Sequence, residues 1–320
     1  MIELLTETGA IGFLAEPVTR PSPDLVPGPG IVRVGVDESG SCPENGLSLF
    51  DIVLTTNTGA PAPWVAVDDL SKEVARLQNA VQEQPLAAAV AAQVFRVGEQ
   101  LDFDSALLLE SLAYSTLLAS EGFQRWHRDL APQKARVDPG ERVRLERRDG
   151  KLEIILNRPR GRNAVDAAMR DALCEALSFA LEDPDNAPVL LRSDAAVFSV
   201  GGDLGEFGTQ SDPASGHSIR TLRSPVRLLH RLGDRATAVL HGPCVGSGIE
   251  IPLAAAEVMA RPRTSFRLPE VSMGLIPGAG GTVSVAKRIG RQRACWMSIS
   301  GCVVEVDRAL TWGLIDAVSQ

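Results

Sequence analysis

Two short segments, GSGIE at residues 246–250 and LPE at residues 268–270, decide how the whole chain is interpreted. Each places a glutamate beside a turn, and a Gly-rich run, PGAGG at 277–281, follows the second. A Gly-Ser-Gly turn that opens an apolar helix can direct backbone N–H groups at a negative oxygen, because the amides of a first helical turn lack intrahelical partners. Two glutamates near such a turn can hold and move protons. The combination indicates a site that can add water beside a carbonyl group.

The composition is that of a globular protein with a large core. The 320 residues are 44% hydrophobic and 22% charged, which permits one large domain or two smaller ones. The formal net charge of −8 argues against a general nucleic-acid binder, whose affinity depends on clustered Lys and Arg. It does not exclude local basic side chains that meet the phosphates of a nucleotide-like substrate. Arginines and glutamates alternate over residues 141–148, so we expect a solvated strand or turn there.

The cysteines and the hydropathy pattern give no sign of secretion or membrane insertion. No CxxC spacing occurs, so we interpret the cysteines as small apolar fillers rather than metal or disulfide sites. The N-terminal residues lack the basic and apolar regions of a secretory signal. No stretch approaches the roughly 18 apolar residues of a membrane span. We expect a cytoplasmic protein with no membrane or nucleic-acid partner. The five cysteines are Cys42, Cys174, Cys244, Cys295 and Cys302.

The first 140 residues divide into three parts. Residues 1–67 are rich in Pro and Gly, with strand-like patterns at 31–36 and 51–54, and we assign them no function. Residues 68–130 predict three helices: one capped by Asp69, one begun by Pro85, and one capped by Asp104 that ends near Trp126. Residues 131–140 form a charged linker that contains Pro and Gly.

Residues 141–320 alternate between strand and helix patterns, which indicates an α/β domain. The helix at 166–181 carries apolar residues on one face, and a second helix should run from the turn at 246–248 to about Ala260. Strands are predicted at 152–156, 188–191, 196–198 and 236–240.

Seven motifs, in order along residues 150–320, make this part resemble the crotonase (enoyl-CoA hydratase/isomerase) superfamily. The resemblance implies a spiral of ββα units, here with an added helical segment, that binds an acyl-CoA thioester. No metal or redox cofactor would be needed, because CoA arrives as part of the substrate. The motifs are NRP at 157–159, NAV at 163–165, FSVGGDL at 198–204, HGPCVGSGIE at 241–250, PE at 269–270, GLIPGAGGT at 274–282 and WGLID at 312–316.

The resemblance also implies roles for individual residues. The backbone N–H groups of Gly202 and Ser247 would form the oxyanion hole, and both glutamates of the hydratases fall on Glu250 and Glu270. Five further positions would contact the substrate, although for Asp203 we favour a role in capping or bracing the turn at 201–202. These positions are Val200, Asp203, Leu204, Gly246 and Gly278.

One feature departs from the family pattern. Relatives usually continue past the WGLID motif with tail helices that build a trimer and close the site, whereas this sequence ends at Gln320. Residues 68–130 resemble that tail, so we consider two explanations: a circular permutation that moves the tail to the N-terminal side, or an unrelated helical extension. A homotrimer or a dimer of trimers is implied by the resemblance alone.

The paired glutamates favour a hydratase that adds water to a 2-enoyl-CoA. Three alternatives stay open: a Δ3,Δ2-enoyl-CoA isomerase, a specialised biosynthetic crotonase, and a non-catalytic acyl-CoA binder. The acyl group should contact residues from about 204–232, where Gly and Ser suggest a mobile loop. His241 and Cys244 flank a Gly-Pro turn, but we favour structural roles for them because no third orienting group accompanies the pair.

Overall fold

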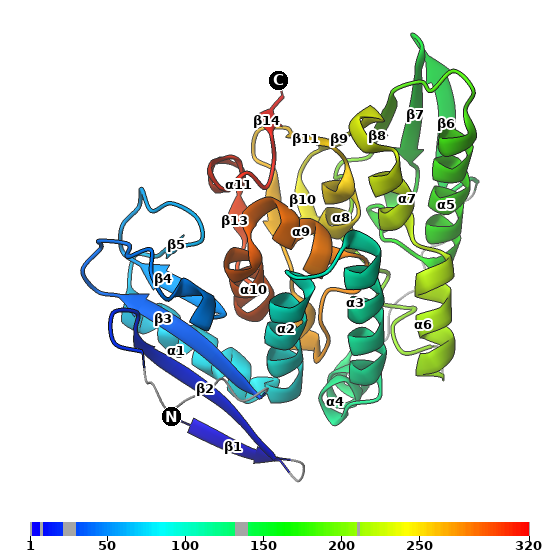
Figure 1. Ribbon diagram of the computed structural model, residues 1–320. Helices are drawn as coiled ribbons and strands as arrows, with labels where there is room; N and C mark the ends of the chain where they lie inside the picture. Colours follow the sequence, from blue (N-terminus) through cyan, green and yellow to red (C-terminus); the bar gives the residue numbers. More distant parts are fainter. Residues whose placement is uncertain (1, 7–8, 22–29, 132–139, 210–211, 320) are drawn as a thin grey trace.

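The computed structural model describes residues 2–6, 9–21, 30–131, 140–209 and 212–319. Most of the predicted linker, residues 132–139, lies outside this described part. The chain is mixed α/β, with three sheets and helices packed between and around them (Figure 1).

A six-stranded sheet forms the frame of the second half of the chain. All neighbouring strands run parallel except β6, which pairs with β7 antiparallel. The inner strands are short apolar runs, as expected of parallel strands covered on both faces. In spatial order the strands are β14 (Ala317–Val318), β11 (Glu257–Ala260), β9 (Ala236–Leu240), β8 (Val189–Ser193), β7 (Lys151–Leu156) and β6 (Val143–Arg148).

A small second sheet lies beside this frame and carries the segments of the future site. It contains β10 (Pro243–Val245), β12 (Ser265–Arg267) and β13 (Val304–Glu305). The chain passes from β9 into β10 and from β11 into β12, so each turn of the spiral contributes to both sheets. The helices of this half are α5 (Ala167–Glu182), α6 (Pro213–Leu222), α7 (Pro225–Arg231), α8 (Ser247–Glu250), α9 (Gly281–Ile289), α10 (Arg291–Ser300) and α11 (Val306–Trp312).

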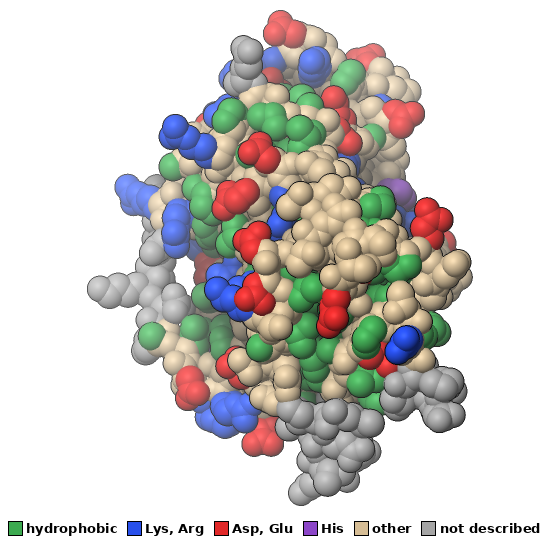
Figure 2. Space-filling model, turned by 90° about the vertical axis from the view of Figure 1, so that its left-hand side faces the viewer, with side chains coloured by type: hydrophobic (Ala, Val, Ile, Leu, Met, Phe, Trp, Pro, Cys, Tyr) green, Lys and Arg blue, Asp and Glu red, His purple; other side chains and the backbone are tan. Residues whose placement is uncertain are grey.

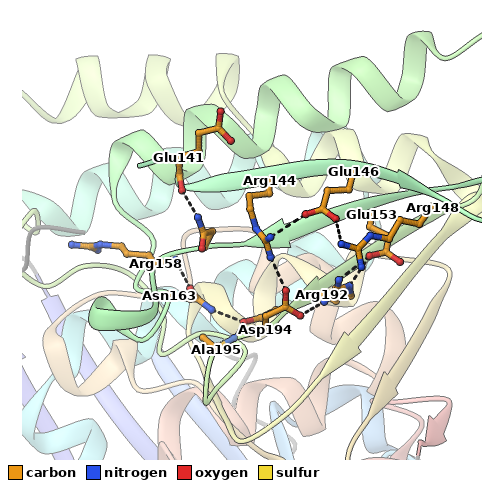
Figure 3. A network of polar contacts seen from close by, with 12 residues as sticks. Glu141, Arg144, Glu146, Arg148, Glu153, Arg158, Asn163, Arg192, Asp194 and Ala195 are labelled. Carbon is orange, nitrogen blue, oxygen red and sulfur yellow. Dashed lines mark hydrogen bonds and ion pairs between the residues drawn. The ribbon is translucent and has the colours of Figure 1, made fainter. Parts of the chain in front are cut away.

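The outer strand β6 is solvated, as the alternating charges predict. Arg144 lies 3.0 Å from Glu146 and 2.6 Å from Asp194, and Arg192 lies 2.8 Å from Glu153 (Figure 3). Partly exposed ion pairs contribute little individually, but those of Arg144 cover the edge strand β6 with charge.

Helix α10 is one of the elements that join the N-terminal sheet to the rest of the protein. Its order is β1 (Ile2–Thr6), β2 (Gly9–Pro17), β3 (Ile31–Asp37), β4 (Ile52–Thr55) and β5 (Val65–Ala66). Arg291 donates to the carbonyls of Phe50 and Ser48, each at 2.8 Å, and Arg293 donates to that of Trp64 at 2.9 Å. These buried or partly buried hydrogen bonds join residues far apart in sequence. Figure 2 shows this side of the molecule, where acidic and basic side chains are interspersed among small apolar patches.

Four helices, not the predicted three, occupy residues 70–129: α1 (Leu70–Glu83), α2 (Pro85–Gly98), α3 (Phe103–Leu118) and α4 (Glu121–Asp129). Asp69 caps α1 and Pro85 begins α2, as predicted. The cap of α3 is Asp102, which accepts from the Ser105 N–H at 2.9 Å, whereas Asp104 lies 2.9 Å from Arg227. The expected long third helix ends at Leu118 because Ser120 caps a new helix.

Three predictions for the second half were wrong. The helix begun at Ser247 ends at Glu250, because Pro252 lacks an N–H and its ring clashes with the preceding turn. The chain then enters β11 well before Ala260. Residues 196–198 form bends rather than a strand. The expected mobile loop contains α6 and α7, with Asp212 and Ser224 as caps.

The four helices pack onto the α/β half instead of standing apart from it. One cluster of buried apolar side chains runs from α1, α2 and α3 through α9 and α10 into the six-stranded sheet. Figure 1 shows α2 and α3 beside α9, and both contact it. This arrangement places α3 next to the segments that carry the predicted site.

Candidate active site

A pocket of about 250 Å³ lies between α3, α6, and the segments around α8 and α9. The predicted residues Gly202, Ser247, Glu250, Glu270 and Gly278 all line it. They come from four separate parts of the sequence, so the fold brings together most of the residues that the motifs singled out.

The other predicted substrate contacts do not line this pocket. Asp203 lies 2.6 Å from Arg158 and accepts from the Gly205 N–H at 2.9 Å, so it braces its turn. Val200 is half-buried and donates its N–H to the Arg162 carbonyl at 3.2 Å, and Leu204 is half-buried beside this turn.

Gly246 lies beside the carboxyl groups of Glu250 and Glu270. A Cβ at this position would lie 2.5 Å from Oε1 of Glu270 and 3.8 Å from Oε1 of Glu250. Its φ of 50° with ψ of −124° is also a conformation that favours glycine. Gly246 therefore allows both carboxylates to approach one turn of backbone.

The backbone N–H groups of Gly202 and Ser247 at the pocket have no acceptor within the described residues. On either side of Gly202, the Gly201 carbonyl accepts from Val165 N–H at 2.8 Å and Asp203 N–H donates to the Val165 carbonyl at 3.0 Å. The N–H of Gly202 donates to nothing within the described residues, and neither does that of Ser247, the first residue of α8. Both groups are available to an oxygen in the pocket, as an oxyanion hole requires.

A buried asparagine fixes the segment that carries Gly202. The Asn163 side chain accepts from Arg158 N–H at 2.8 Å and donates to Ser193 Oγ at 2.7 Å (Figure 3). It also donates to the Phe198 carbonyl at 2.8 Å, and its own carbonyl accepts from Ser199 Oγ at 2.7 Å. These bonds hold the turn after Phe198 in one position.

Glu250 is only 2% exposed, and the start of α9 fixes its carboxylate. Its Oε2 accepts from the N–H groups of Ala279 at 2.7 Å and Gly281 at 2.9 Å. Burial, followed by the neighbouring charges of Glu270 and Glu110, raises the pKa of Glu250. The apolar neighbours of Glu250 in sequence predicted this burial.

Glu270 differs from Glu250 in the hydrogen bonding of its carboxyl group. It begins the 3₁₀ turn Glu270–Met273 and is 7% exposed, and its Oε2 has no hydrogen-bond partner within the described residues. Burial raises the pKa of Glu270 to about 8, and the charge of Glu110 contributes in the same direction. An unpartnered carboxyl oxygen with a pKa near neutrality is suited to accept and return a proton.

A third buried carboxylate, Glu110 of α3, was not predicted as a site residue. Its oxygens accept from Gly280 N–H at 2.7 Å and Thr282 N–H at 2.9 Å, so Glu110 and Glu250 alternate along the four amides from 279 to 282. Burial raises the pKa of Glu110 to about 7. The sequence does contain a signal for it, because Glu110 is the one acidic residue in the apolar stretch LLLESLAY.

Tyr114, one turn further along α3, forms a wall of the pocket. Its ring packs so closely on Gly278 that a side chain at that position would overlap it. The guanidinium of Arg220 from α6 lies over the ring of Tyr114, 4.6 Å from its centroid. Thus α3 and α6, rather than a loop alone, shape this end of the pocket.

The surroundings of His241 and Cys244 fit the structural roles that we expected for them. His241 Nε2 lies 2.8 Å from the Ala195 carbonyl, and burial raises the pKa of the Cys244 thiol to about 12.

Within the part of the chain that the structure describes, no three His, Cys, Asp or Glu side chains are grouped to hold a metal ion. None of the described helices has the length and hydropathy to span a membrane.

Comparison with known proteins agrees with this geometry. The family model described as enoyl-CoA hydratase/isomerase matches residues 146–320, more than half of the chain. The chain therefore belongs to the enoyl-CoA hydratase/isomerase family, that is, to the crotonase superfamily, and has its α/β fold.

Individual relatives are moderately similar. The enoyl-CoA isomerase/hydratase fer4 of Mycosarcoma maydis is 29% identical over 179 residues, which are 53% of this chain and 65% of that protein. The crystal structure of enoyl-CoA hydratase from Thermoplasma volcanium has a TM-score of 0.52 and 29% identity, covering 56% of this chain and 72% of that one. The Bacillus anthracis enoyl-CoA hydratase has a TM-score of 0.52 and 26% identity, covering 56% and 70%.

Proposed function

We propose that this protein is an enoyl-CoA hydratase that adds water reversibly to the double bond of a 2-enoyl-CoA. The observation that carries the proposal is the pair of buried carboxylates that line the pocket beside Gly246: Glu250, held by two amides, and Glu270, whose Oε2 has no partner in the described structure. An isomerase needs one group to shuttle a proton, whereas hydration needs a held water molecule and a proton donor. Two carboxylates beside Gly246 supply both.

The steps follow from the positions of the groups. The thioester oxygen accepts from the N–H groups of Gly202 and Ser247, which stabilise negative charge as water attacks the β-carbon; one such donor is typically worth about 3–4 kcal/mol. Glu250 and Glu270 hold the water between them. Glu270, whose pKa is raised to about 8, takes a proton from water and supplies one to the α-carbon.

The helical segment completes the same site in this proposal. Glu110 and Tyr114 of α3 line the pocket that Glu250 and Glu270 occupy, as tail helices moved by a circular permutation would be expected to do. A position of α3 away from the pocket would have opposed the permutation. The permutation and the trimer both stay proposals, and so does the role of residues 1–67.

The test is the mass of the product formed from crotonyl-CoA by the full-length protein. We expect a gain of one water mass together with loss of the conjugated enoyl-thioester absorbance. Conversion of a 3-enoyl-CoA to a 2-enoyl-CoA without that mass gain would instead support an isomerase. Tight binding of acyl-CoA with no conversion of either substrate would support a biosynthetic enzyme or a non-catalytic binder.

A further inference from the structure

Arg220, on α6, lines the pocket but has no part in the proposed hydration. Its guanidinium stacks on Tyr114 and donates to the side chain of Ser115, to Ser111 Oγ at 3.2 Å and to the Ser111 carbonyl at 3.3 Å. These contacts come from α3 and fix the planar group against one wall. Its Nη1 donates to nothing within the described residues.

No carboxylate neutralises this cation at ion-pair distance in the described part of the chain. Glu110, the carboxylate whose charge influences Arg220, accepts hydrogen bonds with both of its oxygens from the amides of Gly280 and Thr282 at the start of α9. Three other arginines line the pocket, and two of them have carboxylate partners at 2.9 Å: Arg170 pairs with Asp171, and Arg227 pairs with Asp104. The third, Arg223, has no ion pair within the described residues, but it is exposed to solvent, whereas Arg220 is half-buried. Arg220 is thus a preorganised cation whose surroundings hold it without cancelling its charge.

The walls around it are largely apolar. Leu107, Phe207, Val226 and Ile251 line the same pocket, together with the ring of Tyr114. A neutral acyl chain that filled this space would remove water from Arg220 and give nothing in return, which is unfavourable for a buried charge. A carboxylate would pair with it, and a guanidinium is well suited to bind a carboxylate with two hydrogen bonds.

On the basis of the proposed function, we propose that the acyl group of the substrate ends in a carboxylate, which Arg220 binds. The substrate class is then a 2-enoyl-CoA derived from a short dicarboxylic acid, with the thioester carbonyl at the Gly202 and Ser247 amides and the distal carboxylate at α6.

Binding of unreactive saturated thioesters tests this inference without relying on turnover. Glutaryl-CoA and pentanoyl-CoA have the same number of acyl carbons and differ in the terminal carboxylate. We expect the wild-type protein to bind glutaryl-CoA at least tenfold more tightly by calorimetry, in line with a charge-assisted hydrogen bond. Arg220→Met should abolish this preference, and Arg220→Lys should restore part of it, which separates loss of charge from loss of folding.

Arg231→Gln is the matched control. Its side chain is 55% exposed, belongs to α7 and does not line the pocket, so the tenfold preference should persist. Equal affinity of the wild type for the two thioesters would overturn the inference. So would Arg220→Met weakening both thioesters by the same factor, because Arg220 would then bind the phosphates of CoA. Hydration is measured separately, so a protein that prefers glutaryl-CoA but converts no 2-enoyl-CoA would refute only the proposed function.

Discussion

Two regions contribute to one pocket in different ways. Residues 146–320, which match the family model, provide Glu250, Glu270 and the free amides of Gly202 and Ser247. Helix α3, which lies outside the matched range, provides Glu110 and Tyr114. The first region holds the groups that we propose to act on a thioester, and the second places a carboxylate and an aromatic ring beside them.

The contrast is clearest at the start of α9. Glu250 from the matched region and Glu110 from α3 accept alternate N–H groups along residues 279–282. One stretch of four amides therefore orients a proposed catalytic carboxylate and joins α3 to it. A site built in this way cannot be understood from the matched region alone.

Two substitutions test how α3 and the matched region contribute to the pocket. We expect the larger effect from Glu110→Gln. Gln presents an NH₂ group to amides that now meet a carboxylate, so we expect kcat/KM for hydration to fall about tenfold. The negative charge of Glu110 raises the pKa of both Glu250 and Glu270, so its removal lowers them. The acid limb of the rate profile should move to lower pH in a kcat/KM series across pH.

Glu121→Gln is the control for this variant, because Glu121 belongs to the same helical segment but is exposed on α4. Its pH profile should match that of the wild type. An unchanged acid limb in Glu110→Gln would mean that α3 does not act on the reactive carboxylates.

A smaller effect concerns stability. Folding raises the pKa of Glu270 to about 8, above its ordinary value of 4.5, so the folded state retains a proton that the unfolded chain has released. Stability is therefore lost as pH rises from about 4.5 to 8. Glu270→Gln removes this loss, and we expect its Tm to exceed that of the wild type by roughly 2–4 °C at pH 8.5, but by little at pH 4.5.

The exposed Glu305 on β13 provides the comparison, since Glu305→Gln should leave Tm unchanged at both pH values. A gain of equal size at both pH values in Glu270→Gln would contradict a raised pKa, because below 4.5 the carboxyl is protonated in both states.

Local signals in the sequence predicted much of the frame. Asp69 caps α1 as expected, accepting from the Lys72 N–H at 2.9 Å. The helix expected from residue 166 is α5, and Asp166 caps it by accepting from the Met169 N–H at 2.8 Å. The apolar runs at 152–156 and 236–240 are buried strands. Glu250 was recognisable because a charged residue in an apolar segment needs a specific environment.

Tertiary contacts decided what the sequence could not. Asp102 and Asp104 are both suitable caps by residue type. The structure shows that the carboxylate of Asp104 pairs with Arg227 instead of capping α3. Glu110 carried the same signal as Glu250, but its partners lie about 170 residues away in sequence, at Gly280 and Thr282. Arg220 gave no signal, since its environment exists only where α3 and α6 pack together.

The most direct test of the account is kcat for hydration by Glu270→Gln, measured at saturating enoyl-CoA beside wild type and Glu305→Gln. Because Glu270 is proposed to transfer the proton, we predict a loss of at least about 100-fold, with acyl-CoA affinity retained. Activity within a few-fold of wild type would contradict the account, because the unpartnered carboxyl oxygen would then have no part in catalysis.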